Sequence, residues 1–188
     1  MSKGSDQMLE GNEFQQVLQK YEDMIHKNVS YFFDVEEFEE IIDYYIDIHD
    51  YENSLDAYRK GILQHPGSTE LKIKMVQINL EFGKPAQALE LLRTFTSLER
   101  DNSDYYLLKG TALSQTGKVR EAERIFDFAI DKIESNDERV DMLMTIAVAF
   151  DNPNQYRIAL KYLLKAYDIE PDNISVLYDL GYYYERIH

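Results

Sequence analysis

A spacing of 34 residues recurs along this chain and constrains its fold more than any single motif does. Small residues stand 34, 34 and 37 residues apart, at Ser54, Ala88, Ala122 and Ala159. A second series keeps these intervals and adds another of 34, at Phe38, Lys72, Tyr106, Leu143 and Leu177. Pro66 and Pro171 are 105 residues apart, which is the same distance as three repeats with one insertion of three residues. The chain is therefore predicted to repeat one structural unit.

The stretch 104–130 indicates what that unit is. Two patterns with apolar residues at intervals of three and four, the helical period, are joined by a turn at 115–118. Their faces carry Tyr106, Gly110 and Leu113 in the first, and Ala122, Phe126 and Ala129 in the second. Gly110 and Ala122 leave room for one backbone to approach the other, so an antiparallel helix pair is predicted. One pair cannot bury its apolar faces alone, and it needs neighbouring pairs.

A helix–turn–helix unit of 34 residues resembles the tetratricopeptide repeat. The resemblance covers roughly 35–188 and is carried by Leu107, Leu108, Lys109, Gly110, Ala122, Phe126, Ala129, Ile146, Ala147, Phe150, Ala159, Leu163, Ala166, Pro171, the run 177–181 and Tyr184. It implies an all-α fold, a tetratricopeptide-like α-solenoid of antiparallel helix pairs. The second repeat departs from the pattern at Lys72, Asn79 and Phe95. There the buried face is predicted to shift to Leu71, Met75 and Ile78.

The predicted organisation is an N-terminal segment with a capping helix at 1–33, followed by the repeat array at 34–188. The repeats are expected at about 35–68, 69–102, 103–139 and 140–173, with a partial repeat at 174–188. Helices are expected at 9–28, 35–49, 51–64, 69–82, 85–97, 103–115, 119–133, 137–150, 156–169 and 174–187. Asp34 and Glu37 have the spacing of a capping box, so the second helix should begin near Val35.

The net charge of −15 is unevenly distributed, because residues 1–68 carry 5 Lys and Arg against 15 Asp and Glu. Phosphate binding needs a basic surface, so nucleic acid is excluded as a partner, and an anionic membrane is disfavoured for the same reason. A cationic segment of a partner protein would be attracted. The alternative is that the acidic residues only keep the chain in solution.

No catalytic, cofactor or metal site is predicted. The chain has no cysteine, and His26, His49, His65 and His188 lack metal-ligand spacing, so these histidines are interpreted as solvated. The densest acidic cluster lies on an amphipathic helix and does not form a pair of catalytic carboxylates; its members are Glu36, Glu37, Glu39, Glu40, Asp43 and Asp47. The first residues lack the apolar core of a secretory signal, and no apolar run reaches the roughly 18 residues of a membrane span. We expect a cytoplasmic protein that is not an enzyme.

The resemblance also implies a partner site, because the first helix of each tetratricopeptide repeat lines a concave groove. The implied groove residues are Glu36, Glu39, Glu40, Asp43, Ile73, Lys74, Gln77, Leu107, Leu108, Thr111, Met144, Thr145, Val148, Tyr178, Asp179 and Tyr182. Such a groove is acidic at its N-terminal end, and each apolar member either contacts a ligand or is buried by a neighbouring helix. Cochaperone members clamp a carboxylate with basic residues. Here the matching positions hold Glu39, Asp43, Asp104 and Leu108, with Lys74 alone basic, so no such clamp is expected.

The last helix raises a separate expectation. Leu177, Leu180, Tyr183 and Tyr184 form a stripe that a following helix would cover, and the sequence stops at His188. Either the chain is part of a longer array or multidomain protein, or the stripe joins two copies in a homodimer. The leading prediction is a non-catalytic scaffold that binds a protein or peptide, with self-assembly as the alternative.

Overall fold

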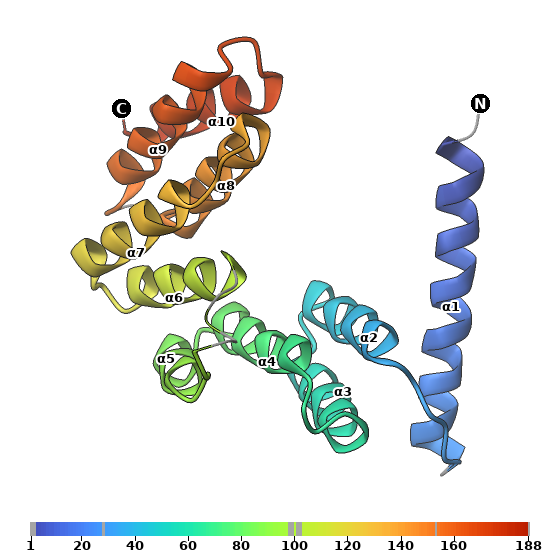
Figure 1. Ribbon diagram of the computed structural model, residues 1–188. Coiled ribbons are helices and arrows are strands. Elements are labelled where there is room, and N and C mark those ends of the chain that lie inside the picture. The colour runs from blue at the N-terminus through green and yellow to red at the C-terminus, as the bar shows by residue number, and fades with distance from the viewer. Residues whose placement is uncertain (1–2, 28, 98–99, 101–102, 153, 188) are drawn as a thin grey trace. The chain divides into compact units, whose positions relative to one another are not determined.

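The computed structural model describes residues 3–27, 29–97, 100, 103–152 and 154–187. This part of the chain contains ten α-helices and no strand (Figure 1). They are α1 (Lys3–Lys27), α2 (Val35–Asp47), α3 (Tyr51–Gln64), α4 (Thr69–Glu81), α5 (Pro85–Arg93), α6 (Ser103–Gln115), α7 (Val119–Asp131), α8 (Asn136–Ala149), α9 (Tyr156–Ile169) and α10 (Ile174–Ile187). The predicted bounds of α3, α6, α9 and α10 are confirmed. The structure starts α1 earlier and ends α5 earlier than predicted, and the predicted end of α1 at Asn28 lies outside the described residues.

The chain divides into two compact units, the N-terminal unit Met1–Gly83 and the C-terminal unit Lys84–His188. Each unit has a hydrophobic core of its own. The division falls between α4 and α5, inside the predicted second repeat. The boundary at residues 33 and 34 between the capping segment and the repeat array is a different kind of division and stays a prediction.

The N-terminal unit is built on the pair α2–α3, with α1 packed against α2 and α4 packed against both helices of the pair. Tyr21, Phe33 and Phe38 are fully buried in its core, and the ring centroids of Phe33 and Phe38 are 5.5 Å apart. The predicted capping box starts α2: the Asp34 carboxylate accepts from the Glu37 amide, and the Glu37 carboxylate accepts from the Asp34 amide, both at 2.8 Å. The first helix therefore covers the first pair, as predicted.

The connector before α2 is fastened to the end of α3. The Gln64 side chain accepts from the Phe33 amide at 3.0 Å and donates to the Tyr31 carbonyl at 3.1 Å. His65 Nε2 lies 2.8 Å from the Phe33 carbonyl oxygen. The interpretation of His65 as a solvated side chain is thus wrong, because the histidine helps to hold this connector.

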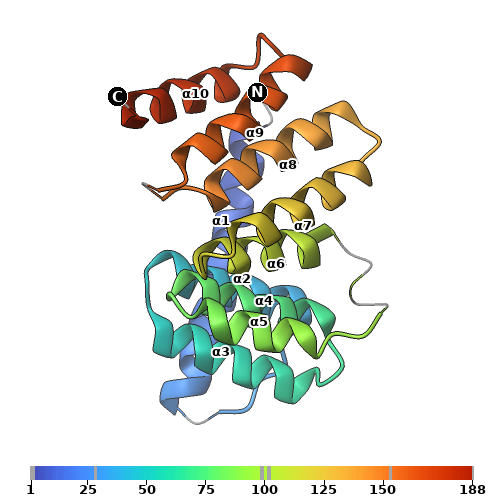
Figure 2. The ribbon, with the colours of Figure 1, turned by 90° about the vertical axis from the view of Figure 1, so that its left-hand side faces the viewer.

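The C-terminal unit contains the pairs α6–α7 and α8–α9, with α5 against α6 and α10 against α9 (Figure 2). Phe126, Phe150 and Tyr162 form its aromatic centre, where the last two rings stack with centroids 5.7 Å apart. Gly110 of α6 lies directly against the Phe126 ring of α7. A Cβ atom on Gly110 would lie no more than 2.7 Å from three carbons of the Phe126 ring, so the site requires glycine.

The two repeated series have different outcomes. The small residues Ser54, Ala88, Ala122 and Ala159 are all fully buried, as close helix packing requires. In the second series Phe38 and Leu143 are buried, but Leu71, Tyr105 and Val176 are buried in place of their neighbours Lys72, Tyr106 and Leu177. One residue is a rotation of about 100° on a helix, so α4, α6 and α10 each turn a different face inward than the series implied. For α4 this shift was expected, and the burial of Leu71 and Ile78 agrees with it. The third expected residue, Met75, is only half-buried, and Asn79, which the shift should have turned outward, is buried.

A buried polar link joins α6 to the turn between α8 and α9. The Ser114 hydroxyl lies 2.9 Å from the Ala149 carbonyl and 2.6 Å from Oε1 of Gln155, and Nε2 of Gln155 donates to the Ser114 carbonyl at 3.3 Å. Both side chains are buried. A serine and a glutamine 41 residues apart carry no sequence pattern, and this link was not predicted.

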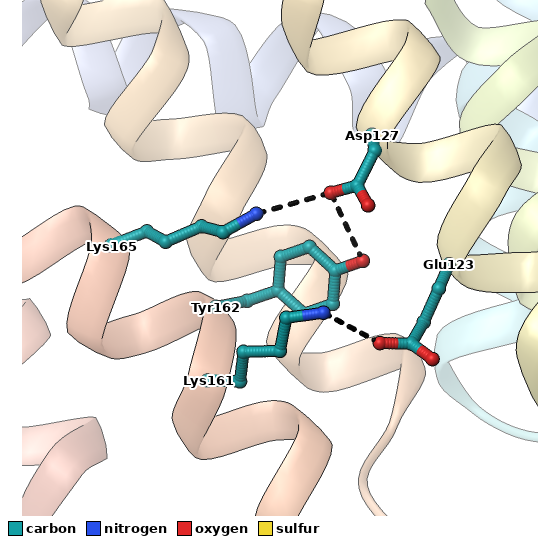
Figure 3. A network of polar contacts seen from close by, with 5 residues as sticks. All are labelled: Glu123, Asp127, Lys161, Tyr162 and Lys165. Atoms are coloured by element: carbon teal, nitrogen blue, oxygen red, sulfur yellow. Dashed lines mark hydrogen bonds and ion pairs between the residues drawn. The ribbon is translucent and has the colours of Figure 1, made fainter.

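A second polar network joins α7 to α9, the second helices of successive pairs (Figure 3). Lys161 pairs with Glu123 at 2.7 Å, and Lys165 pairs with Asp127 at 3.1 Å. The Tyr162 hydroxyl donates to the same Asp127 carboxylate at 3.4 Å, and burial together with this carboxylate raises the pKa of Tyr162 above its usual range. These two carboxylates are therefore occupied inside the unit.

Candidate partner-binding site

The acidic residues of α2 lie on the side of the helix that faces away from the core. Phe38, Ile41, Ile42 and Tyr45 are buried, which leaves Glu36, Glu40 and Asp43 exposed and Glu39 half-buried. The hydrophobic spacing of α2 thus forces these carboxylates outward. We call Glu36, Glu39, Glu40 and Asp43, with Lys74 of α4, the acidic face.

Lys74 ties the acidic face to α4. Its ammonium lies 2.8 and 2.6 Å from the two carboxylate oxygens of Asp43, and its side chain is only 12% exposed. The structure therefore brings together the predicted groove residues of α2 and α4. The ammonium of Lys74 is thus paired with Asp43. No ion-pair partner is found within the described ranges for the carboxylates of Glu36, Glu39 and Glu40.

The carboxylates of the acidic face are crowded. Partial burial raises the pKa of Glu39, with repulsion from Asp43, Glu70 and Glu36 acting in the same direction and attraction to Lys74 opposing them. Partial burial and the carboxylates of Glu36, Asp34, Glu37 and Asp43 likewise raise the pKa of Glu40. The charged form of each group is thus less favourable than in water. A cation placed on this face would relieve the repulsion.

The other predicted members on α4 are less accessible. Ile73 is 8% exposed, so the expectation that it faces a ligand is wrong. Gln77 is half-buried, and its Oε1 atom has no hydrogen-bond partner among the described residues. Ile73 therefore provides no apolar contact for a ligand on the acidic face.

In the C-terminal unit, the predicted groove residues lie on α6, α8 and α10. Leu107, Thr111, Met144, Asp179 and Tyr182 are half-buried, and Thr145, Val148 and Tyr178 are exposed. Leu108 is buried at 8% exposure and belongs to the packing of α6, so its assignment to the groove is wrong. Val148 and Tyr178 are 62% and 75% exposed, which leaves two large apolar side chains available on α8 and α10.

The apolar stripe predicted on α10 is only half exposed. Leu180 and Tyr183 are buried, and the Tyr183 hydroxyl donates to the Ala147 carbonyl of α8 at 3.3 Å. Leu177 and Tyr184 are 46% and 45% exposed. The prediction of a single bare stripe is wrong, because Val176, Leu180 and Tyr183 form the inner face of this helix. Its exposed apolar residues are Ile174, Leu177, Tyr178 and Tyr184.

Neither a metal-binding cluster nor a membrane-spanning helix is found among the described residues. No group of histidine, aspartate and glutamate side chains is arranged to hold a metal ion in this part of the chain. None of the described helices combines the length and apolar character that crossing a bilayer requires.

No protein-family model and no curated protein matches the sequence. The helix arrangement does match solved structures. Two crystal structures of MamA superpose with TM-scores of 0.52 and 0.51 at 21% and 22% identity, covering 82% and 79% of this chain and 85% and 80% of theirs. YrrB, described as a TPR protein with an unusual peptide-binding site, superposes with a TM-score of 0.57 at 18% identity, over 93% of this chain and 87% of its own. The chain has the tetratricopeptide-repeat fold.

This result confirms the predicted fold class, an all-α, tetratricopeptide-like α-solenoid. Identities of 18–22% show that the fold is shared and give no information on the ligand.

Proposed function

We propose that the chain is a non-catalytic interaction scaffold whose acidic face binds a cationic peptide or helix of a partner protein. One observation carries the proposal: three carboxylates, those of Glu36, Glu39 and Glu40, share one surface on which the nearby lysine is already held by Asp43. A lysine or arginine of a ligand would supply the missing counter-charge.

The surroundings support a cationic ligand. The N-terminal unit carries 7 Lys and Arg against 17 Asp and Glu, so its net charge attracts cations before contact. Contact with an exposed carboxylate contributes about 0.2–1 kcal/mol per pair. Peptide binding, named in the description of YrrB, is a use to which this fold is put.

The first test neutralises the acidic face. In the variant Glu36→Gln, Glu39→Gln, Glu40→Gln, a short peptide of alternating lysine and alanine should bind roughly tenfold more weakly, because up to three exposed ion pairs are lost. The loss should shrink as salt is added, since charges are screened over about 8 Å at physiological ionic strength. Titration calorimetry measures the affinity, and Asp43 is left intact to keep its pair with Lys74.

The matched control is the variant Glu81→Gln, Glu134→Gln, Glu185→Gln, which removes the same total charge from exposed sites outside the acidic face. It should keep most of the affinity for the lysine peptide. Equal losses in both variants would mean that the peptide senses only the net charge, and the acidic face would then have no special role.

The raised pKa values of Glu39 and Glu40 predict how binding depends on pH. Both pKa values are raised, so these carboxyls take up protons at a higher pH than ordinary glutamates do. The affinity for the lysine peptide should therefore fall at a higher pH than it would for glutamates of ordinary pKa. A carboxyl whose pKa is higher in the folded than in the unfolded state lowers the free energy of unfolding when the pH is above the folded-state pKa. This loss of stability disappears when the pH falls below the unfolded-state pKa. Affinity that stays constant down to pH 4.5 would contradict the assignment.

A second candidate function, self-association, is favoured by one observation. Ile174 and Tyr178 are 81% and 75% exposed on α10, beside the half-exposed Leu177 and Tyr184. If two copies meet through this face, light scattering should show the mass rising with concentration, and Leu177→Lys with Tyr178→Glu should return it to that of one chain. A mass that stays at 22.2 kDa at all concentrations would remove this candidate.

A further inference from the structure

The C-terminal unit contains an open cleft of about 420 Å³ between the end of α5, one side of α6 and the start of α7. Its apolar lining residues, which we call the floor, are Leu89, Leu92, Leu113 and Ile125, and Tyr105 also lines the cleft. Its size falls within the roughly 300–1,000 Å³ that ligand-binding pockets commonly have. We call it the basic cleft, for the charges described next.

Basic side chains surround this cleft. Within the described part of the chain, its charged lining residues are Arg93, Arg100, Lys109, Lys118, Arg124 and a single acid, Glu121. The whole sequence has 20 Lys and Arg against 35 Asp and Glu. A quarter of the basic residues of this sequence thus lie around one cleft. From the composition of the chain, acidic residues would be expected to outnumber basic ones there.

Most of these charges are available to a ligand. Lys118 and Arg124 are exposed, and neither forms an ion pair with any described carboxylate. Lys109 places its ammonium 5.5 Å from the ring centroid of Tyr105, a weak cation–π contact that leaves its hydrogen-bond donors available. Arg93 pairs with Glu90, but this pair is about 70% exposed on both sides and contributes little.

The basic cleft and the predicted groove use opposite sides of α6. Tyr105, Lys109 and Leu113 follow one another at intervals of four, on the side of the cleft. Leu107 and Thr111 lie between them in sequence, and a helix turns by about 100° per residue. These two residues therefore point to the far side, and a ligand in the cleft would not use the predicted groove.

We propose that the basic cleft binds a short acidic segment of a partner protein, with one apolar side chain on the floor and carboxylates on either side of it. The apolar floor favours such a peptide over a compact inorganic anion, which would leave the floor uncovered. A long polyanion such as nucleic acid is disfavoured because the field of a chain with net charge −15 repels it. A peptide with few charges close to the cleft is attracted by the local cations.

The test uses a fluorescent peptide in which one leucine is flanked by glutamates, titrated at low salt and followed by anisotropy. In the variant Lys118→Gln, Arg124→Gln, this peptide should bind roughly five- to tenfold more weakly, as expected for two exposed charge pairs. The matched control, Arg59→Gln with Arg157→Gln, removes the same charge from exposed positions that do not line the cleft and should change the affinity less than about twofold. All four substituted side chains are exposed, so both variants should fold. Thermal melts that match the wild type would verify this.

The peptide itself supplies the second comparison. Replacing its leucine by glycine should weaken binding severalfold, because the apolar floor is then left empty. Equal losses in the cleft variant and its control would overturn the proposal. So would full competition by inorganic phosphate, or tighter binding of a single-stranded oligonucleotide, since each would show a site for phosphate. The cleft variant should still bind the lysine–alanine peptide normally, so this test can fail without affecting the acidic face.

Discussion

Replacing Gly110 with alanine should lower the free energy of unfolding of the C-terminal unit by about 2–3 kcal/mol, the upper part of the range for overpacked cores. The new Cβ would lie no more than 2.7 Å from three carbons of the Phe126 ring, and that ring is enclosed by Phe150 and Tyr162. Either the ring or the α6 backbone must then move. Chemical denaturation followed by circular dichroism measures the change.

Gly181 provides the matched control, because it occupies the equivalent repeat position in α10. A Cβ there meets no atom within 4 Å, and alanine is the better helix former. Gly181→Ala should therefore leave stability unchanged or raise it by up to about 1 kcal/mol. If the two substitutions have the same effect, the close contact between α6 and α7 is not what fixes glycine at residue 110.

The second large effect is expected at Phe126. Its ring is fully buried at the aromatic centre of the C-terminal unit, 5.5 Å from Phe150 and 6.4 Å from Tyr162 between centroids. Phe126→Ala removes that ring and leaves a cavity, which costs about 3–5 kcal/mol. The C-terminal unit should unfold at a much lower denaturant concentration, or should lose its cooperative transition altogether.

The same substitution two residues later tests whether burial is the cause. Phe128 is 48% exposed and touches Tyr106 at a centroid distance of 5.1 Å. Phe128→Ala should cost about 1 kcal/mol, the scale of an aromatic pair. Comparable losses at both positions would mean that α7 presents a different face to the core.

The fold was predictable because its main determinants are local and periodic. The series from Ser54 to Ala159 marks where helices approach closely, and the capping box at Asp34 and Glu37 sets where α2 begins. The capping box depends on one short stretch of sequence, and the small residues recur at the repeat spacing. Both signals could therefore be read from the sequence before the packing of the helices was known.

The inward face of each helix was harder to predict. In α10, Leu177 fits the repeat series, but Val176 is the buried residue, and Leu180 and Tyr183 follow it inward. In α6, Leu108 was assigned to the ligand side although it is buried. A shift of one residue turns a helix by about 100°, and the packing of its neighbours decides that rotation.

No sequence pattern predicted the basic cleft. Its cations come from the end of α5, the segment before α6, α6 itself, the turn after it, and α7, at residues 93, 100, 109, 118 and 124. They share neither a motif nor a helical period. The acidic face could be predicted from the sequence because it lies mainly on one helix. The cleft could not, because it forms only when three helices pack together.

The acidic face and the basic cleft give the chain surfaces of opposite charge, each within its own unit. Glu36, Glu39 and Glu40 favour cationic segments, whereas Lys118 and Arg124 favour acidic ones. One chain could in this way hold two different partners, or two segments of one partner. Peptides of opposite charge should then bind without competing.

A cationic ligand is proposed to bind on the acidic face. A nitrogen-15 NMR titration of the whole chain with the lysine–alanine peptide tests it most directly, because each backbone amide reports its own surroundings. The largest shifts should appear at Glu36, Glu39 and Glu40 of α2 and at Lys74 of α4, and they should disappear in the Gln variant of the three glutamates. Shifts that spread evenly over the acidic residues of both units, or that remain in the Gln variant, would contradict it.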